Sequence, residues 1–203
     1  MLFSGKKRSK LVGVDIGTTS IKLVELSRAG RSVRVDHYAL EPLAPGLIIE
    51  HQIKDIDQVS QALQRLVSRS GTKVKRAAVC VASTNVITKS ITVQSDTGDE
   101  ELEALVEVEA DRVVPYALDD VNIDFVNVGK TSQSADEDQL QLVVCRKNMV
   151  ESLVSVLEEA GLEAAAVDVD HFALARVNDF VSQGHVGGGQ ERTTALMDFG
   201  FNT

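Results

Sequence analysis

Apolar and polar positions alternate along the start of the chain in the pattern that predicts β-strands. We expect strands over residues 10–16, 20–27 and 31–40, separated by short turns at 17–19 and 29–30. Strands that are joined by such short turns pair antiparallel. The beginning of the chain therefore predicts a three-stranded antiparallel sheet.

A helix and a further strand follow this sheet. Apolar residues recur at helical spacing between Asp57, a candidate N-terminal cap, and Gly71, which ends the helix. The apolar stripe comprises Val59, Ala62, Leu63, Leu66 and Val67. The run 76–83, RAAVCVAS, is typical of a buried strand. We expect this strand to join the sheet and the helix to cover one of its faces.

The pattern changes near residue 85, where a smaller unit of strands and helices begins. The elements expected here are a half-exposed strand over 86–93, a helix over 99–114, and a hairpin of 121–128 with 140–146. The polar loop of that hairpin, 129–139, is interpreted as a solvated tip. This stretch indicates a small α+β subdomain that is inserted into a larger protein.

The last part of the chain returns to longer apolar runs. The elements expected are a helix over 148–160, a buried strand over 162–170, a helix over 171–180 and an apolar strand over 193–200. A glycine-rich connector lies between the last two. The whole pattern predicts an α/β fold with an insertion at residues 85–165.

Composition and charge narrow the classes of function. The 203 residues carry a net charge of −9 and a pI of about 4.9, which argues against nucleic-acid binding because phosphate backbones require a basic face. No apolar run is long enough for a transmembrane helix. Residues 1–10 are basic but contain no signal-peptide core, and they are interpreted as a solvated end, with contact to an anionic membrane surface as the alternative. Cys80 and Cys145 lack metal spacing, which indicates reduced thiols in a cytosolic protein.

Two segments place an acid at the end of an apolar strand. LVGVDIGTTS contains Asp15 and TALMDFGFNT contains Asp198, and each acid is followed by Gly and by small or hydroxyl-bearing residues. A Gly/Thr/Ser turn presents backbone N–H groups to an anion, and Mg²⁺ can join that anion to a carboxylate. Lys22 adds a point charge that can reach phosphate. One such turn alone could be an ordinary tight hairpin, whereas the pair predicts two loops that clamp the phosphates of a nucleotide.

These motifs resemble the phosphate-binding loops of the actin, hexokinase and heat-shock chaperone ATPase superfamily. The chain is most similar to the first portion of the PilM family of type IV pilus assembly. Three segments carry this likeness, which runs from about residue 10 to the end: GVDIGTTSIKLVEL, EELEALVEVEADRVVPYALDDV and AGLEAAAVDVDHFALAR. In the related division protein FtsA, the first loop usually lacks a lysine placed like Lys22, which favours PilM.

The resemblance implies an actin-like (ribonuclease H-like) mixed sheet with flanking helices. It divides the chain into a core subdomain over 9–84 and 166–182 and the inserted subdomain over 85–165. Residues 183–192 would connect the core to a second lobe, of which 193–203 would be the start. On this reading the chain is truncated inside the second phosphate loop, and its nucleotide site is incomplete as given.

The resemblance also implies a binding site for ATP and Mg²⁺. The expected cofactor-binding residues are Asp15, Gly17, Thr18, Thr19, Ser20, Lys22, Asp198, Gly200, Asn202 and Thr203. Asp15 and Asp198 would lie near the metal. Asp170 corresponds to an acid that orients the attacking water in related ATPases, although Asp168 competes for this position and either acid could instead cap a helix. The full-length protein would be at most a weak ATPase, and this chain is expected to be inactive.

The function implied by the resemblance is that of a cytoplasmic nucleotide-binding scaffold. Such a protein would hold the N-terminal cytoplasmic peptide of PilN in a groove between core and insertion. It would contact other pilus platform proteins and lie at the cytoplasmic face of the inner membrane through these partners. The alternatives are an FtsA-like cell-division protein, a polymerising actin relative, and an ATP-dependent sugar kinase. The kinase is disfavoured because no polar cluster suitable for a sugar pocket is evident in the sequence.

A separate hypothesis concerns Glu109 in the helix of the insertion. At about 100° per residue, Leu102, Leu105, Val106 and Val113 share one sector of this helix, and Glu109 lies near its middle. A carboxylate in an apolar stripe needs a hydrogen-bond donor or an opening. One interpretation is an internal pair within the insertion. The other places Glu109 at the seam between insertion and core, where it would help to form the groove for the partner peptide.

Overall fold

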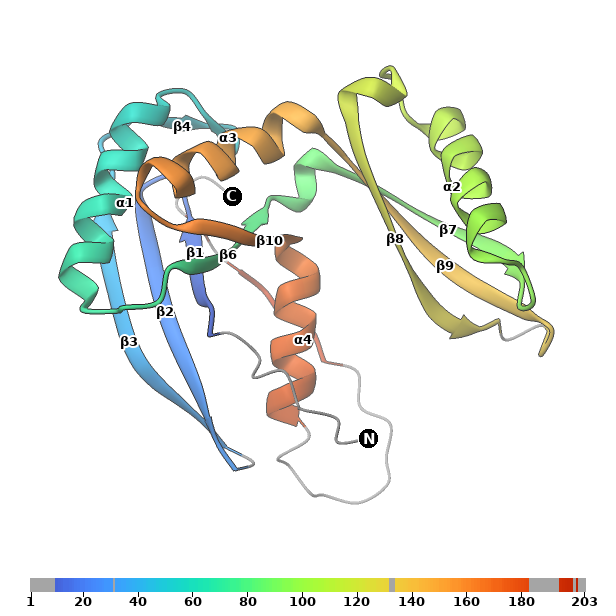
Figure 1. The fold of residues 1–203 in the computed structure, drawn as a ribbon, viewed down its shortest axis with the longest axis horizontal. Coiled ribbons are helices and arrows are strands. Elements are labelled where there is room, and N and C mark those ends of the chain that lie inside the picture. Colours follow the sequence, from blue (N-terminus) through green and yellow to red (C-terminus); the bar gives the residue numbers. More distant parts are fainter. Residues whose placement is uncertain (1–9, 31, 132–133, 183–193, 199, 201–203) are drawn as a thin grey trace, which may run out of the picture. The chain divides into compact units, whose positions relative to one another are not determined.

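The computed structural model describes residues 10–30, 32–131, 134–182, 194–198 and 200 (Figure 1). These residues form two compact units. The first contains the described residues up to Cys80 and those from Ser152 onward, and the second is Val81–Glu151. Each unit is described by itself below.

A five-stranded mixed sheet is the centre of the first unit. Its strands are β1 (Val12–Ile16), β2 (Ser20–Ala29), β3 (Ser32–Pro42), β6 (Arg76–Val81) and β10 (Glu163–Val169), in the order β10-β6-β1-β2-β3. The strand β2 pairs antiparallel with both β1 and β3, whereas β1 pairs parallel with β6. The three antiparallel strands that the alternating pattern predicts are confirmed, and so is the α/β class.

Helix α1 (Ile56–Ser70) packs against β2 and β3, and its buried side includes all five residues of the predicted apolar stripe. The predicted stop at Gly71 is confirmed, since its φ of 75° is the left-handed conformation that glycine favours. The predicted N-terminal cap, Asp57, is wrong by two residues. Asp55, in extended backbone conformation, accepts a hydrogen bond from Gln58 N at 2.9 Å, whereas Asp57 lies inside the first turn. There the Asp57 carboxylate still interacts favourably with the positive end of the helix dipole.

A short hairpin between β3 and α1 has no counterpart in the sequence analysis. It consists of β4 (Ile48–Ile49) and β5 (Gln52–Ile53). The two turn residues, Glu50 and His51, have φ values of 50° and 58°. A two-residue hairpin turn of type I′ requires positive φ at both positions, and Asn-Gly is its usual signal. Glu-His gives no such signal, so the hairpin could not be recognised from the residues.

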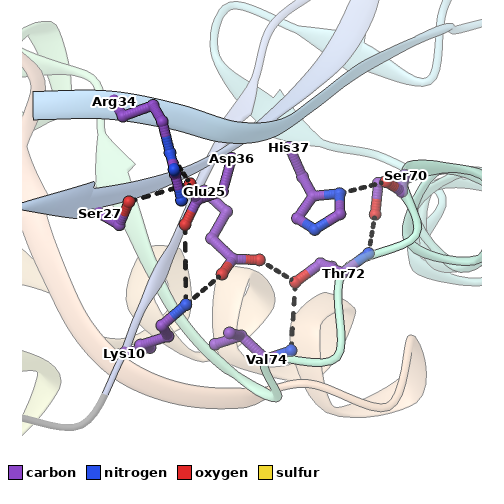
Figure 2. A network of polar contacts seen from close by, with 9 residues as sticks. All are labelled: Lys10, Glu25, Ser27, Arg34, Asp36, His37, Ser70, Thr72 and Val74. Atoms are coloured by element: carbon purple, nitrogen blue, oxygen red, sulfur yellow. Dashed lines mark hydrogen bonds and ion pairs between the residues drawn. The ribbon is translucent and has the colours of Figure 1, made fainter.

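A polar network joins β2, β3 and the loop that follows α1 (Figure 2). Glu25 is 3% exposed and accepts hydrogen bonds from Lys10 Nζ at 3.2 Å and Thr72 Oγ1 at 2.6 Å. The Thr72 hydroxyl also accepts from Val74 N at 3.1 Å, so it is held in place by the backbone. The hydrogen bond from Thr72 is the main reason why the pKa of Glu25 is lowered, and Lys10 contributes. The buried carboxylate is therefore satisfied while ionised.

The second unit is a three-stranded antiparallel sheet with one helix on it. The elements are β7 (Val86–Gln94), α2 (Asp99–Val113), β8 (Val121–Lys130) and β9 (Glu137–Arg146), in the strand order β7-β9-β8, with 3-10 turns at Ser83–Asn85 and Leu118–Asp120. Val106 and Ala110 of α2 pack into a core with alternate residues of the strands, such as Ile91, Leu140 and Leu142. All the elements expected for this stretch are confirmed.

The polar segment 129–139 is shorter as a loop than predicted. β8 extends to Lys130 and β9 begins at Glu137, so the ladder runs into the expected tip. Lys130 Nζ lies 3.0 Å from Asp138 Oδ1, and Asn127 Nδ2 donates to the other oxygen of Asp138. These cross-strand contacts stabilise polar residues within the sheet. Polarity alone therefore predicted a longer loop than the structure has.

The chain returns to the first unit through α3 (Lys147–Glu159), β10 and α4 (Asp170–Ser182). The connector 183–192 lies outside the described residues. The strand expected over 193–200 is not formed by its described residues, 194–198 and 200, which belong to no helix or strand. Leu196 and Met197 are exposed there, and no described strand pairs with this run. Among the described residues, no helix is both long and apolar enough to cross a membrane.

Candidate functional site

The turn between β1 and β2 is closed by backbone hydrogen bonds. Gly17 N donates to Ser20 O at 3.0 Å, and Leu43 N donates to Thr19 O at 2.8 Å, which ties the turn to the end of β3. A Cβ atom on Gly17 would lie only 3.3 Å from Ser20 O, so a larger residue would require the backbone of the turn to shift by a few tenths of an ångström. The hydroxyl-bearing residues of the predicted phosphate loop are thus held on a defined backbone.

Asp15 and Lys22 face each other across the β1–β2 ladder, where they are directly paired in register. The Lys22 ammonium lies 2.7 Å from Asp15 Oδ2, and the two side chains are 57% and 63% exposed. Val12 and Val14 of the same strand are buried. The acid at the end of this core strand is therefore exposed and paired, so it does not carry the free-energy cost of a buried, unpaired carboxylate.

Asp15, Cys80 and Asp170 lie at the ends of three neighbouring strands of the sheet. The strands β1 and β6 are parallel, so Asp15 and Cys80 both lie at the carboxyl ends of neighbouring strands, and Asp170 directly follows β10 on the other side of β6. Burial raises the pKa of the half-buried Cys80 thiol, and the negative charges of Asp170 and Asp15 raise it further. Both carboxylates are therefore within electrostatic reach of one thiol, which the sequence analysis treated only as a reduced cysteine.

The two acids that compete for the position of the water-orienting residue have different partners. Asp168 forms an ion pair with Arg176 of α4 and accepts from Val169 N at 2.8 Å. Asp170 is the first residue of α4 and accepts from His171 N at 2.6 Å. Asp168 is thus engaged in fixing α4 to β10, and Asp170 is the acid whose charge acts on Cys80 together with that of Asp15.

The second predicted loop is only partly described. Asp198 and Gly200 are exposed, while Asn202 and Thr203 lie outside the described residues. Within the described part of the chain, no hydrogen bond or ion pair joins Asp198 to the turn at 17–19. The structure thus brings together the residues of the first loop but does not bring Asp198 to them.

Glu109 lies in the second unit and has partners there. Its carboxylate accepts from Lys89 Nζ of β7 at 2.7 Å and forms a second ion pair with Arg112. The hydrogen bond from Lys89 is the main cause that lowers the pKa of Glu109, and the positive charge of Arg112 acts in the same direction. The donor that the sequence analysis required for this carboxylate is therefore present within the unit itself. A role of Glu109 at a seam with the core stays a hypothesis.

The residues at the first turn suit a hydrated divalent cation with phosphate. Asp15 offers an exposed carboxylate, Lys22 an ammonium, and Thr18, Thr19 and Ser20 offer hydroxyl and backbone donors. Mg²⁺ keeps most of its waters and is often bound by one or two carboxylates together with substrate phosphates. Such a site does not need a cluster of protein ligands. In the described part of the chain, no group of three or more His, Cys, Asp or Glu side chains could hold a metal by itself.

The mixed sheet, the acid-turn-lysine arrangement and the inserted unit define an actin-like protein. The family model of the type IV pilus assembly protein PilM matches residues 13–203. The chain belongs to the PilM family.

Two solved structures show the same fold. A structure of a PilM-PilN type IV pilus biogenesis complex is 25% identical, has a TM-score of 0.75, and is matched over 87% of this chain and 52% of its own. The cytoplasmic domain of EpsL, an inner membrane component of the type II secretion system of Vibrio cholerae, is 13% identical with a TM-score of 0.52. That match covers 79% of this chain and 57% of the EpsL domain. The present chain thus spans about half the length of these structures.

Proposed function

We propose that this protein is a nucleotide-binding scaffold of type IV pilus assembly that holds the N-terminal cytoplasmic segment of PilN. The observation that carries the proposal is the match to a PilM-PilN complex over 87% of the chain at a TM-score of 0.75. Through PilN and other platform proteins, the scaffold would lie at the cytoplasmic face of the inner membrane.

We further propose that ATP and Mg²⁺ bind at the turn between β1 and β2. Bound Mg²⁺ would neutralise phosphate charge beside Asp15. The hydroxyls and backbone N–H groups of residues 17–20 would position the phosphates, and Lys22 would add its charge. Its present ion pair with Asp15 is exposed, so the ammonium can exchange one anionic partner for another at little cost. Asp170 is the candidate for orienting water, because its charge and that of Asp15 both act on Cys80.

The proposed role of the nucleotide is to shift the affinity for PilN. Two ligands that bind one protein at different places are linked by a coupling free energy, and the coupling is reciprocal. ATP with Mg²⁺ should therefore change the dissociation constant of the PilN segment by about fivefold or more, and the segment should change nucleotide affinity by the same factor.

The test is fluorescence anisotropy with a labelled peptide of the PilN N-terminal segment from the same organism and the full-length protein. We expect saturable binding with a dissociation constant of about 1–100 μM, which corresponds to roughly −8 to −5 kcal/mol. A peptide of the same composition in scrambled order is the control. Equal binding of both peptides, or no binding of either, would refute the scaffold proposal.

A further inference from the structure

A groove runs along the outer edge of β7. Its volume is about 480 Å³, and it is lined by the consecutive residues 89–94 together with Glu101, Leu105 and Glu109 of α2 and by Glu137. Successive side chains of a strand point to opposite faces of the sheet. A cavity on one face would be lined by every second residue, so one that is lined by six in a row follows the edge of the strand.

The edge that borders this groove is available for pairing. β7 is an outer strand of the order β7-β9-β8. It pairs with β9 without a register shift over all nine residues, from Val86 to Gln94. In an antiparallel ladder, alternate residues direct their N–H and C=O groups away from the neighbouring strand. The outer edge of β7 therefore presents a regular row of backbone donors and acceptors to the groove.

The opposite edge of the same sheet differs in this respect. In β8 the register shifts between Asn127 and Gly129, and Gly129 has a φ of 112°. Such a bulge interrupts the regular spacing of edge groups and is one way in which proteins prevent unwanted strand pairing. β7 contains no irregularity of this kind, so the two edges of this sheet are not equally protected.

The second wall of the groove is one stripe of α2. Glu101, Leu105 and Glu109 follow each other at intervals of four residues and so lie along one side of the helix. Leu105 is 38% exposed and can contact an apolar side chain in the groove. Figure 1 shows α2 running alongside β7. The groove thus has the backbone edge of β7 on one side. On the other side it has one apolar side chain, Leu105, that lies between two carboxylates of α2.

The charge of the groove selects the kind of occupant. Three carboxylates, Glu101, Glu109 and Glu137, face one ammonium, that of Lys89. Glu109 already neutralises Lys89 at 2.7 Å, whereas Glu101 and Glu137 have no ion pair in the described part of the chain. Pairing with a second copy of this strand would bring these acids together, which costs free energy. A basic segment would instead be attracted.

We propose that the edge of β7 binds an extended, basic segment of a partner protein as a fourth strand of this sheet. The partner backbone would pair with β7, an apolar side chain would contact Leu105, and lysine or arginine side chains would reach Glu101 and Glu137. This is the strand-addition mode of peptide recognition, in which main-chain hydrogen bonds give affinity and side-chain contacts give specificity. The inference is independent of the proposed binding of PilN and of nucleotide.

The first experiment uses a nine-residue probe, the length of β7, in which valine and threonine alternate with lysine. Amide hydrogen exchange of the full-length protein is measured with and without the peptide. Strand addition predicts at least about tenfold slower exchange at alternate residues of 86–94. It also predicts that a control peptide, in which glutamate replaces each lysine, binds about tenfold more weakly. Protection outside β7 alone, no protection, or equal binding of the two peptides would overturn the proposal.

Backbone pairing is separated from simple charge attraction by N-methylation of the probe. Two peptides keep all side chains but carry methyl groups on either the odd or the even backbone nitrogens. Because only alternate N–H groups of a strand face a given neighbour, one methylated peptide should lose at least about tenfold in affinity and the other should bind nearly as before. If both peptides bind equally well or both fail to bind, the proposal is wrong.

The charge contribution is tested with matched variants of the protein. Glu101→Lys with Glu137→Lys should weaken binding of the lysine probe about tenfold or more. Glu103→Lys with Glu107→Lys is the control, because it changes the net charge equally at exposed positions of α2 that do not line the groove. Circular dichroism checks that both variants fold. An equal loss of affinity in both pairs, or dimerisation of the wild-type protein that the groove variant abolishes, would contradict the assignment.

Discussion

The Lys22 ammonium lies 2.7 Å from the Asp15 carboxylate at the point where β1 ends and the first turn begins. Both side chains are more than half exposed, at 57% and 63%. Exposed ion pairs contribute only about 0–1 kcal/mol to the free energy of unfolding. The pair therefore adds little to stability, and its position beside the hydroxyl-bearing turn is better explained by binding.

This geometry predicts a separation of function from stability in Lys22→Ala. In the full-length protein, the affinity for ATP with Mg²⁺ should fall about tenfold or more, while the free energy of unfolding changes by less than about 1 kcal/mol. Isothermal titration and urea unfolding measure the two quantities. Lys54→Ala, which removes an exposed ammonium that donates to Gln52 Oε1 at 2.8 Å, is the control and should leave affinity unchanged. Unchanged affinity in Lys22→Ala would remove this residue from the site.

Thr72 is predicted to set the acid stability of the first unit through Glu25. The hydrogen bond from Thr72 lowers the pKa of this buried carboxyl. The pKa of a glutamate in an unfolded chain is about 4.3. Because the folded-state pKa of Glu25 is lower, its contribution to the free energy of unfolding is fully present above the unfolded-state pKa and is lost as the pH falls through the folded-state pKa. Thr72→Val should therefore shift the acid-unfolding midpoint to higher pH.

The matched variant for this prediction is Thr72→Ser, which keeps the hydroxyl and should retain most of the acid stability. At neutral pH, Thr72→Val should cost about 1–3 kcal/mol, since it leaves a buried charged acceptor with one donor fewer. Unfolding followed by circular dichroism at several pH values gives both numbers. Identical acid midpoints for the valine and serine variants would show that the hydroxyl does not control Glu25.

Glu109→Gln tests the two interpretations of this carboxylate. Its ion pairs with Lys89 and Arg112 predict a lower melting temperature in the variant. The pKa of Glu109 is lowered in the folded protein, so the difference from wild type should decrease below about pH 4.3 and disappear as the pH falls through the folded-state pKa. The seam hypothesis predicts instead that affinity for the PilN segment falls several-fold with little change in melting temperature. Thermal unfolding and peptide anisotropy are measured on the same samples. Glu107→Gln, at an exposed position of α2, is the control.

Much of the fold and the first half of the candidate site could be predicted from residue patterns. The alternation in 10–27 places Asp15, the turn and Lys22 next to each other in sequence, so any hairpin brings them together. Helix α1 and its stop at Gly71 follow from periodicity and from one glycine. Local spacing suffices in these cases because the contacts are local.

The remaining features depend on contacts that no local pattern encodes. The left-handed turn at Glu50 and His51 lacks its usual residues, and the expected strand at 193–200 finds no partner strand among the described residues. The choice between Asp168 and Asp170 was open in the sequence because both acids lie at the end of one strand. In the structure Asp168 pairs with Arg176 and the charge of Asp170 acts on Cys80, while Asp170 as the water-orienting acid stays a prediction.

Cys80 offers a direct test of how Asp15 and Asp170 are arranged. Burial and the charges of Asp170 and Asp15 raise the pKa of this thiol, which keeps the reactive thiolate scarce at pH values near the ordinary thiol pKa of about 8.5. Removing either negative charge should lower the pKa again. We therefore expect Asp15→Asn and Asp170→Asn each to increase the alkylation rate of Cys80 by iodoacetamide at about pH 8.

Cys145 is the internal control for this experiment. Burial raises its pKa as well, but Arg146, not an aspartate, is the charged group that acts on it. Its alkylation rate should be the same in all variants, and mass spectrometry of the two cysteine peptides reports both rates in one sample. Asp57→Asn is the matched substitution, because this acid is exposed in the first turn of α1 and is not among the charges that shift the pKa of Cys80. If Cys80 reacts no faster in Asp15→Asn and Asp170→Asn than in Asp57→Asn, the two candidate site acids do not share its surroundings.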